Sequence, residues 1–265
     1  MSLIKRMNLS TTSIEKYGYH LYTFDENIND DLIERCCQSH RGFQPVNCSR
    51  AAEVFYFESH GKGYFYKSYL KRSLFEGVKN WFRRNNRAVR ATLGNQILNQ
   101  HGFLSPKTIL IGHGFKNNID FTVTEKIENA LPFSEYFIQH AETRRDYMHA
   151  FAKTLYAFHA KGLYHGDLRW DNIFVKCVGK GEYHFIFIDN ERTKYFSKLP
   201  MKKRIRNLVQ LNKAPLEILS IKWRLYFFKH YYHDNLVSNR KTFMNHIQSE
   251  TIARTRTKPR THHEI

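Results

Sequence analysis

The chain has 265 residues, of which 42% are apolar and 15% aromatic, so it has enough apolar material for a core and is not globally disordered. Lys and Arg number 42 against 24 Asp and Glu, and the net charge of +18 indicates an anionic partner: nucleic acid, acidic lipid or a phosphorylated substrate. No apolar run reaches the roughly 18 residues of a membrane span, and the start lacks a long apolar stretch, so we expect neither a spanning segment nor a signal peptide.

Residues 1–47 carry few structural signals apart from a short helix expected at 30–40. The cysteines have no metal-binding spacing, so we expect free thiols in a reducing cytoplasm. Residues 53–70, EVFYFESHGKGYFYKSYL, are aromatic and β-branched on either side of two glycines. Because glycine readily takes positive φ, this pattern predicts a β-hairpin.

Residues 85–103, NNRAVRATLGNQILNQHGF, repeat small and apolar residues at helical spacing. Gly102 lies where a glycine commonly ends a helix. Two short strands are expected next, in 105–112 and 119–127. The first part of the chain therefore reads as hairpin, helix and two strands.

The second part is richer in helix. Residues 134–162 predict one long helix with an apolar stripe that Gly162 closes. Residues 183–189, YHFIFID, predict a strand, and the chain from Met201 onward reads as helical and basic. We expect a domain at 1–126, with its sheet and helix in 48–126, a helical domain at 127–247, and a disordered basic tail at 248–265.

The stretch YHGDLRWDNIFV, residues 164–175, lies between the long helix and the strand and holds the chemistry. Asp167 and Asn172 are five residues apart, and Asp189 follows Asp167 by 22 residues at the end of the strand. If one strand leaves the loop and a second strand returns to it, Asp189 would lie beside the loop. Phosphoryl transfer needs a carboxylate for the attacking hydroxyl and oxygen ligands for Mg²⁺. Taken singly, the three residues fit a cap, a turn and a strand end; together they favour catalysis.

These residues resemble the protein-kinase-like superfamily. HGDLRWDN is similar to its catalytic loop, FIFIDN to its metal-binding strand, and GYFYKSY to the strand with its phosphate-binding lysine, here Lys67. RAVRATLGNQILNQHGFLSPK, FTVTEKIENALPF and RIRNLVQLN further resemble bacterial lipopolysaccharide kinases, the Kdo and heptose kinases of the inner core. The resemblance implies an α+β, two-lobed kinase-like fold with a small antiparallel-sheet lobe and a helical lobe.

The resemblance also implies roles. Asp167 is the expected base, and Asn172 and Asp189 the expected Mg²⁺ ligands. Lys67 is expected to neutralise the phosphates of ATP, and Arg169 the charge of the transition state. His165 is expected to hold the loop together.

Two further contacts with ATP follow from the same resemblance. The backbone of Glu125 and of Ile127, in the connection between the lobes, is expected to bind adenine. Arg50 and nearby backbone N–H groups are expected to contact phosphate.

Three departures from the protein-kinase pattern are present. The helix position that usually supplies a glutamate partner for the lysine holds Ala91, and Glu76 lies outside that helix. The residues around Arg50 contain no G-x-G-x-x-G loop. Asp189 is followed by Asn-Glu with no activation segment, which argues against a regulated protein kinase.

The expected partners are a lipopolysaccharide core glycolipid and the anionic cytoplasmic face of the inner membrane. Basic residues are frequent in 71–90. The segment KWRLYFFKHYY, residues 222–232, alternates cationic and aromatic residues. This mix is found at membrane surfaces and equally in a core helix with solvated lysines. Nucleic acid is disfavoured because no RNP, KH or zinc signature is present. The rival interpretations are a kinase of another small molecule or protein, and a pseudokinase or basic nucleic-acid-binding scaffold. The sequence does not predict the oligomeric state.

Overall fold

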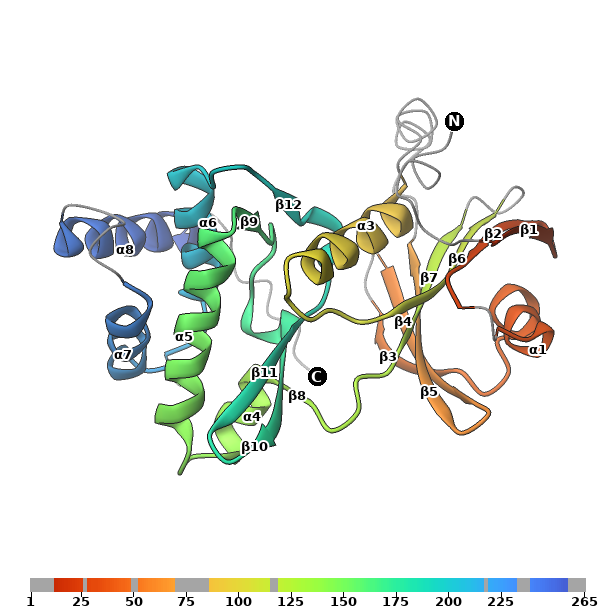
Figure 1. The fold of residues 1–265 in the computed structure, drawn as a ribbon, viewed down its shortest axis with the longest axis horizontal. Helices are drawn as coiled ribbons and strands as arrows, with labels where there is room; N and C mark the ends of the chain where they lie inside the picture. The colour runs from red at the N-terminus through yellow and green to blue at the C-terminus, as the bar shows by residue number, and fades with distance from the viewer. Residues whose placement is uncertain are drawn as a thin grey trace. The chain divides into compact units, whose positions relative to one another are not determined.

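A computed structural model describes residues 12–25, 28–48, 52–69, 86–114, 119–216, 219–232 and 239–256. The chain forms two compact units. The first ends at Glu128 and the second begins at Asn129, except that Ile97–Leu104 belongs to the second. Figure 1 shows the helices and strands of each unit.

Within the described part of the first unit, seven strands form one antiparallel sheet in the order β1-β2-β6-β7-β5-β4-β3. The strands are β1 (Thr12–Lys16), β2 (Tyr19–Thr23), β3 (Gln44–Cys48), β4 (Ala52–Ser59), β5 (Lys62–Tyr69), β6 (Thr108–Gly114) and β7 (Asp120–Glu125). The predicted hairpin is confirmed as β4 and β5, in which Ser59 pairs with Lys62. His60 and Gly61 between them both have positive φ, as a two-residue hairpin turn requires.

The two faces of this sheet are covered by different helices. Because successive side chains of a strand point to opposite faces, Leu110 and Ile111 enter different clusters. Leu110 packs with α1 (Asp30–Glu34) and the π-helical turn η2 (Arg35–Ser39). Ile111 packs with the first turns of α3 (Arg87–Gln100), the helix predicted at 85–103.

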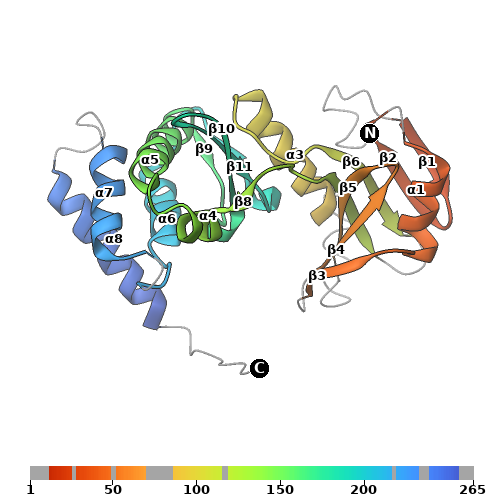
Figure 2. The same cartoon turned by 90° about the horizontal axis from the view of Figure 1, so that it is seen from below.

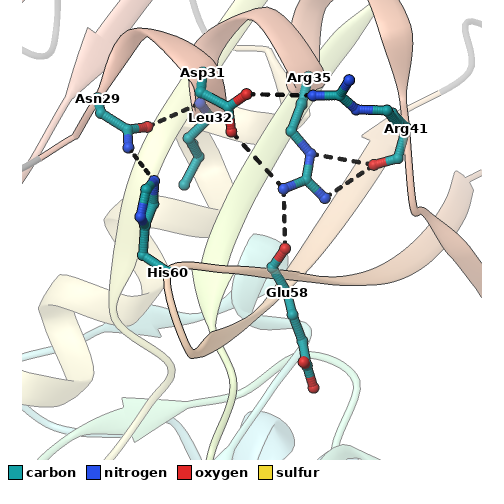
Figure 3. A network of polar contacts seen from close by, with 7 residues as sticks. All are labelled: Asn29, Asp31, Leu32, Arg35, Arg41, Glu58 and His60. Atoms are coloured by element: carbon teal, nitrogen blue, oxygen red, sulfur yellow. Dashed lines mark hydrogen bonds and ion pairs between the residues drawn. The ribbon is translucent and has the colours of Figure 1, made fainter.

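The N-terminal segment joins the first unit more fully than its sequence predicts. The side chain of Asn29 caps α1 by accepting from Leu32 N at 2.9 Å, and its Nδ2 donates to His60 in the hairpin turn. Arg35 donates to the carbonyls of Glu58 and Arg41 (Figure 3). These contacts attach the helix to the end of the β4–β5 hairpin.

In the second unit, α5 (Arg144–Ala160) is the central helix and lies beside α7 (Ile221–Tyr231) in both views (Figures 1 and 2). The other helices are α4 (Phe133–Gln139), α6 (Met201–Leu211) and α8 (Arg240–Arg256), with short turns η3 (Trp170–Asn172) and η4 (Asn190–Arg192). Strands β8 (Leu131–Pro132), β10 (Ile173–Gly179) and β11 (Glu182–Phe187) form a small sheet in the order β11-β10-β8, and β9 (Leu163–Tyr164) pairs with β12 (Lys194–Tyr195). The core is largely aromatic and is centred on α5, whose Phe151, Leu155 and Phe158 are fully buried.

The single long helix predicted at 134–162 is wrong in one respect, because the chain breaks between α4 and α5. His140 ends α4, and its ring stacks on Tyr136 with centroids 4.1 Å apart. Arg144, the first residue of α5, donates from Nε to the carbonyl of Phe137 at 2.7 Å. Its guanidinium thus satisfies a terminal carbonyl of α4, which lets the helix stop there.

The tail predicted to be disordered from residue 248 is helical through Arg256, so that prediction is wrong for 248–256. Phe243, Ile247 and Thr251, four residues apart, are buried. Thr251 also accepts from Asn212 Nδ2 at 3.0 Å. None of the helices in the described part of the chain combines the length and apolar character needed to cross a membrane.

Candidate active site

The loop that carries Asp167 runs from β9 to η3 in the second unit, and its backbone is tightly bonded. The N–H of Asp167 donates to His165 Nδ1 at 3.3 Å, and its carbonyl accepts from the Arg169 N–H at 3.0 Å and from Asn172 Nδ2 at 2.9 Å. The Asp167 side chain is 35% exposed, with Arg169 Nε 3.5 Å from its Oδ1. A fixed backbone with an accessible carboxylate suits a group that accepts a proton from a bound hydroxyl.

His165 connects this loop to the strand that leads to Asp189. Because its Nδ1 accepts from Asp167, its Nε2 carries the proton and donates to the carbonyl of Ile188 at 3.0 Å. The ring is fully buried, and burial lowers the pKa of His165 to about 4. It is therefore neutral near pH 7, in keeping with the structural role expected for it.

Asn172 and Asp189 are brought together by the hairpin of β10 and β11, which leaves the loop and returns to it. The Ile188 N–H donates to the Asn172 carbonyl at 3.0 Å, so Asp189 directly follows the point of contact. Asp189 has φ of 59° and ψ of 43°, a left-handed conformation that is uncommon outside glycine and clusters at functional sites. The return of the strand end to the loop is as predicted.

The two residues suit an Mg²⁺ ion by their chemistry. The bond from Nδ2 to Asp167 orients the buried amide of Asn172, and no hydrogen bond reaches its Oδ1 within the described residues. An amide oxygen and a carboxylate are hard ligands, and Mg²⁺ usually takes one or two such groups together with phosphates and water. The described ranges contain no group of three or more His, Cys, Asp or Glu side chains placed to hold a metal, which this mode of binding does not need.

Gly166 explains why this loop reads His-Gly-Asp. Its φ is +84°, and an added Cβ would lie 2.5 Å from the Cβ and 2.7 Å from the carbonyl oxygen of Arg192. Residues other than glycine rarely adopt this backbone conformation, and a side chain at this position would have no space.

Lys67 lies on β5 in the first unit, on the sheet face that α3 covers. Its Nζ is 5.5 Å from the centre of the Tyr69 ring, and the guanidinium carbon of Arg87 is 4.9 Å from the same ring. Ala91 packs against the cluster that contains Tyr69. Two cations therefore lie near one aromatic ring on the face of the sheet that α3 covers.

The predicted adenine contacts also lie in the first unit. The Glu125 N–H donates to the carbonyl of Lys107 at 3.0 Å, and its carboxylate pairs with Lys107 Nζ at 3.1 Å. The N–H of Ile127 donates no hydrogen bond to any other described residue. Of the remaining predicted residues, Arg50 and Glu76 lie outside the described ranges.

Two residues that contact the loop were not predicted from the sequence. Asn207 and Gln210 lie on α6 and hydrogen-bond the backbone around Asp167. The one available signal was a pair of amides three residues apart beside an apolar stripe, which does not point to a particular partner.

The fold is that of the protein-kinase-like class: an antiparallel sheet with a helix, followed by a helical part. A solved structure described as WaaP in complex with acyl carrier protein is similar to this chain with a TM-score of 0.57 and 16% identity, covering 85% of this chain and 98% of that one. A crystal structure of WbdD matches with a TM-score of 0.49 and 18% identity, over 79% of this chain and 50% of that one. No curated protein sequence matches the chain.

The sequence matches the Lipopolysaccharide kinase (Kdo/WaaP) family over residues 46–232, and the chain belongs to this family. The protein is therefore a kinase that phosphorylates a sugar of the lipopolysaccharide core, as the resemblance predicted. Strands β1 and β2, with α1 and η2, precede the matched region.

Proposed function

We propose that the phosphate donor is ATP, that Asp167 is the base and that the acceptor is a Kdo or heptose hydroxyl of the inner core. Two hydrogen bonds carry this proposal. Asn172 Nδ2 donates to the carbonyl of Asp167, and the N–H of Ile188, the residue before Asp189, donates to the carbonyl of Asn172. Asp167 orients the sugar hydroxyl and accepts its proton, while Asn172 Oδ1 and the Asp189 carboxylate hold Mg²⁺. That ion supplies charge neutralisation to the phosphates. Arg169 stabilises the charge that develops during transfer.

The contacts with the nucleotide phosphates are assigned to residues 48–126, and the catalytic loop to residues 127–247. Lys67 neutralises phosphate charge, and Arg50 contributes a second cation. The Ile127 N–H is a backbone donor without a partner among the described residues, which suits a ring nitrogen of adenine. The Glu125 carbonyl is the matching acceptor.

The acceptor glycolipid and the net charge of +18 favour a peripheral position on the anionic cytoplasmic face of the inner membrane. Among the aromatic residues of 222–232, Phe227, Phe228 and Tyr231 are buried and do not form the contact. The exposed face of α7 carries Ile221, Lys222, Leu225 and Lys229, which combines apolar and cationic groups. Such a face suits anionic headgroups above an apolar layer.

The test is incubation of the protein with ATP, Mg²⁺ and core glycolipids of defined truncation, read by mass spectrometry. We expect one phosphate to be gained on one truncation, and Asp167→Ala to reduce the rate by at least about a thousandfold, because transfer depends on positioning and electrostatics at this group. The matched control is Asp171→Ala, since Asp171 lies in the same loop and accepts from Ser134 Oγ at 2.9 Å. Retained activity in Asp167→Ala contradicts the assignment of the base.

The rival of a different class is a pseudokinase or basic nucleic-acid-binding scaffold. Thermal shift with ATP, with and without Mg²⁺, discriminates between the two. A kinase gains stability from the nucleotide with a dependence on Mg²⁺, because binding to the folded state alone raises the melting temperature. No shift, together with no phosphate on any glycolipid, contradicts the proposed function.

A further inference from the structure

The side-chain amide of Gln210, on helix α6, hydrogen-bonds the backbone before and after Asp167. Nε2 of Gln210 donates to the Gly166 carbonyl at 2.8 Å, and its Oε1 accepts from the Leu168 N–H at 3.2 Å. These two groups belong to the residues immediately before and after Asp167. A single side chain thereby holds the backbone on both sides of the proposed base.

The orientation of this amide is set by its neighbour on the helix. Asn207 Nδ2 donates to Gln210 Oε1 at 3.0 Å, which fixes the oxygen of Gln210 on the side of Leu168. Asn207 Oδ1 accepts from the His165 N–H at 3.2 Å. Asn207 is fully buried, so an incorrectly oriented amide there would leave buried polar groups without hydrogen-bond partners, which is unfavourable.

A buried chain of hydrogen bonds orients Asn207 in turn. Arg204 donates to the Tyr231 hydroxyl at 2.9 Å, so that hydroxyl donates onward to His159 Nδ1 at 2.8 Å. His159 Nε2 then carries the proton and donates to Asn207 Oδ1 at 3.2 Å. Burial, reinforced by Arg204, lowers the pKa of His159 to about 3, so the ring stays neutral and every donor in the chain points toward the loop.

The backbone before Asp167 needs such a support. Gly166 has the least restricted backbone of any residue type, and it directly precedes the proposed base. The direction of the Asp167 side chain follows from the peptide planes on either side of it. Anchoring the carbonyl before it and the N–H after it removes the freedom that glycine introduces.

We propose that Gln210 is a positioning residue for phosphate transfer, which directs the Asp167 carboxylate by holding the peptide groups on both sides of it. This inference rests on the proposed role of Asp167 as the base. Gln210 does not touch the reacting atoms. It acts through Asp167, and Asn207 orients it.

The test compares Gln210→Met and Gln210→Glu in the full-length protein. Met has a similar length without the hydrogen bonds, and Glu keeps the acceptor toward Leu168 but loses the donor toward Gly166. We expect kcat to fall about 10- to 100-fold in Gln210→Met, since displacement of a catalytic group by about 1 Å has costs of this order. The KM for ATP should stay within about twofold. Gln210→Glu should fall between Gln210→Met and wild type.

Two readouts separate positioning from general loss of structure. Hydrogen exchange of the Leu168 amide should accelerate in Gln210→Met while the exchange of core amides in α5 is unchanged. The control is Asn212→Ala at the C-cap of the same helix, since the Asn212 amide bonds Thr251 and Arg224 and not the loop. That variant should lose stability while keeping kcat.

The double variant Gln210→Met with Asp167→Ala links the effect to the base. If Gln210 acts through Asp167, the double variant is no slower than Asp167→Ala alone. A wild-type kcat in Gln210→Met, or a further loss in the double variant, overturns the inference. By contrast, retained activity in Asp167→Ala itself contradicts the proposed function, so the two failures are distinguishable.

Discussion

Gly166, between His165 and Asp167, shows how the sequence of the loop depends on a distant residue. Its positive φ turns the chain so that His165 points into the core while Asp167 stays accessible. The space that a Cβ would need is occupied by the backbone of Arg192, beyond Asp189. The glycine is therefore required by contact between two parts of the second unit as well as by its own backbone conformation.

Gly166→Ala is expected to reduce kcat at least about tenfold and to lower the melting temperature. The added Cβ cannot fit 2.7 Å from a backbone oxygen, so the loop or the segment at Arg192 has to move. Steady-state kinetics and thermal unfolding measure the two effects.

The matched control is Gly181→Ala in the β10–β11 turn. Gly181 also has positive φ, +76°, but no atom lies within 4 Å of an added Cβ. This variant should lose only about 1–2 kcal/mol of stability from backbone strain and keep its activity. Equal kinetics for the two variants would contradict the steric explanation.

At the scale of elements, α8 shows that a polar segment can form a stable helix when only a narrow stripe of its side chains is buried. Its exposed residues are mostly polar and basic, and its buried side is limited to Phe243, Ile247 and Thr251. One buried position per turn gives no strong apolar period, which explains why disorder was expected. Contact with α6 supplies the stability that an isolated helix of this composition lacks.

Ile247→Ala is expected to lower the free energy of unfolding by about 2–5 kcal/mol, because it leaves a cavity at a fully packed position. Ile252→Ala in the same helix is the control, since Ile252 is 44% exposed and should change the free energy by less than about 1 kcal/mol. Urea unfolding monitored by circular dichroism measures both. A loss in Ile247→Ala no larger than that of the control would show that α8 does not pack on the second unit in solution.

At the scale of the whole molecule, the charge of +18 is the property most relevant to the proposed membrane contact. Charge of this size attracts any polyanion, so specificity for a membrane surface has to come from the positions of the cationic and apolar side chains. The exposed face of α7 places Lys222 and Lys229 beside two exposed aliphatic side chains.

Binding to anionic phosphatidylglycerol vesicles is expected to fall at least about tenfold between 0.1 and 1 M salt, as the screening length shortens from about 10 to about 3 Å. Co-sedimentation measures the bound fraction, with phosphatidylcholine vesicles as the neutral reference. Lys222→Glu with Lys229→Glu should weaken binding at least tenfold, given about 1 kcal/mol for each basic residue near the surface. Lys176→Glu with Lys180→Glu makes the same change of charge on β10 and its turn and should have a smaller effect. Binding that is indifferent to salt would remove the electrostatic argument.

Several features of the fold and the site could be predicted from local pattern. The hairpin at His60, the glycines that end helices and the order of Asp167, Asn172 and Asp189 depend on residues close in sequence. The break at His140 could not be predicted, because the apolar stripe continues across it and only the cap from Arg144 reveals the stop. Strands β1 and β2 were missed because their five-residue segments become recognisable only when β6 pairs with β2.

The sequence by itself determined the reaction class and the family, since motif identity, spacing and hydrophobic period are properties of the chain in order. Only the tertiary structure decided what holds the catalytic loop. Gln210 and Gly166 are 44 residues apart, and their hydrogen bond follows no period that a sequence displays. Such a contact depends on how α6 packs against the loop, and packing is set by the whole second unit at once.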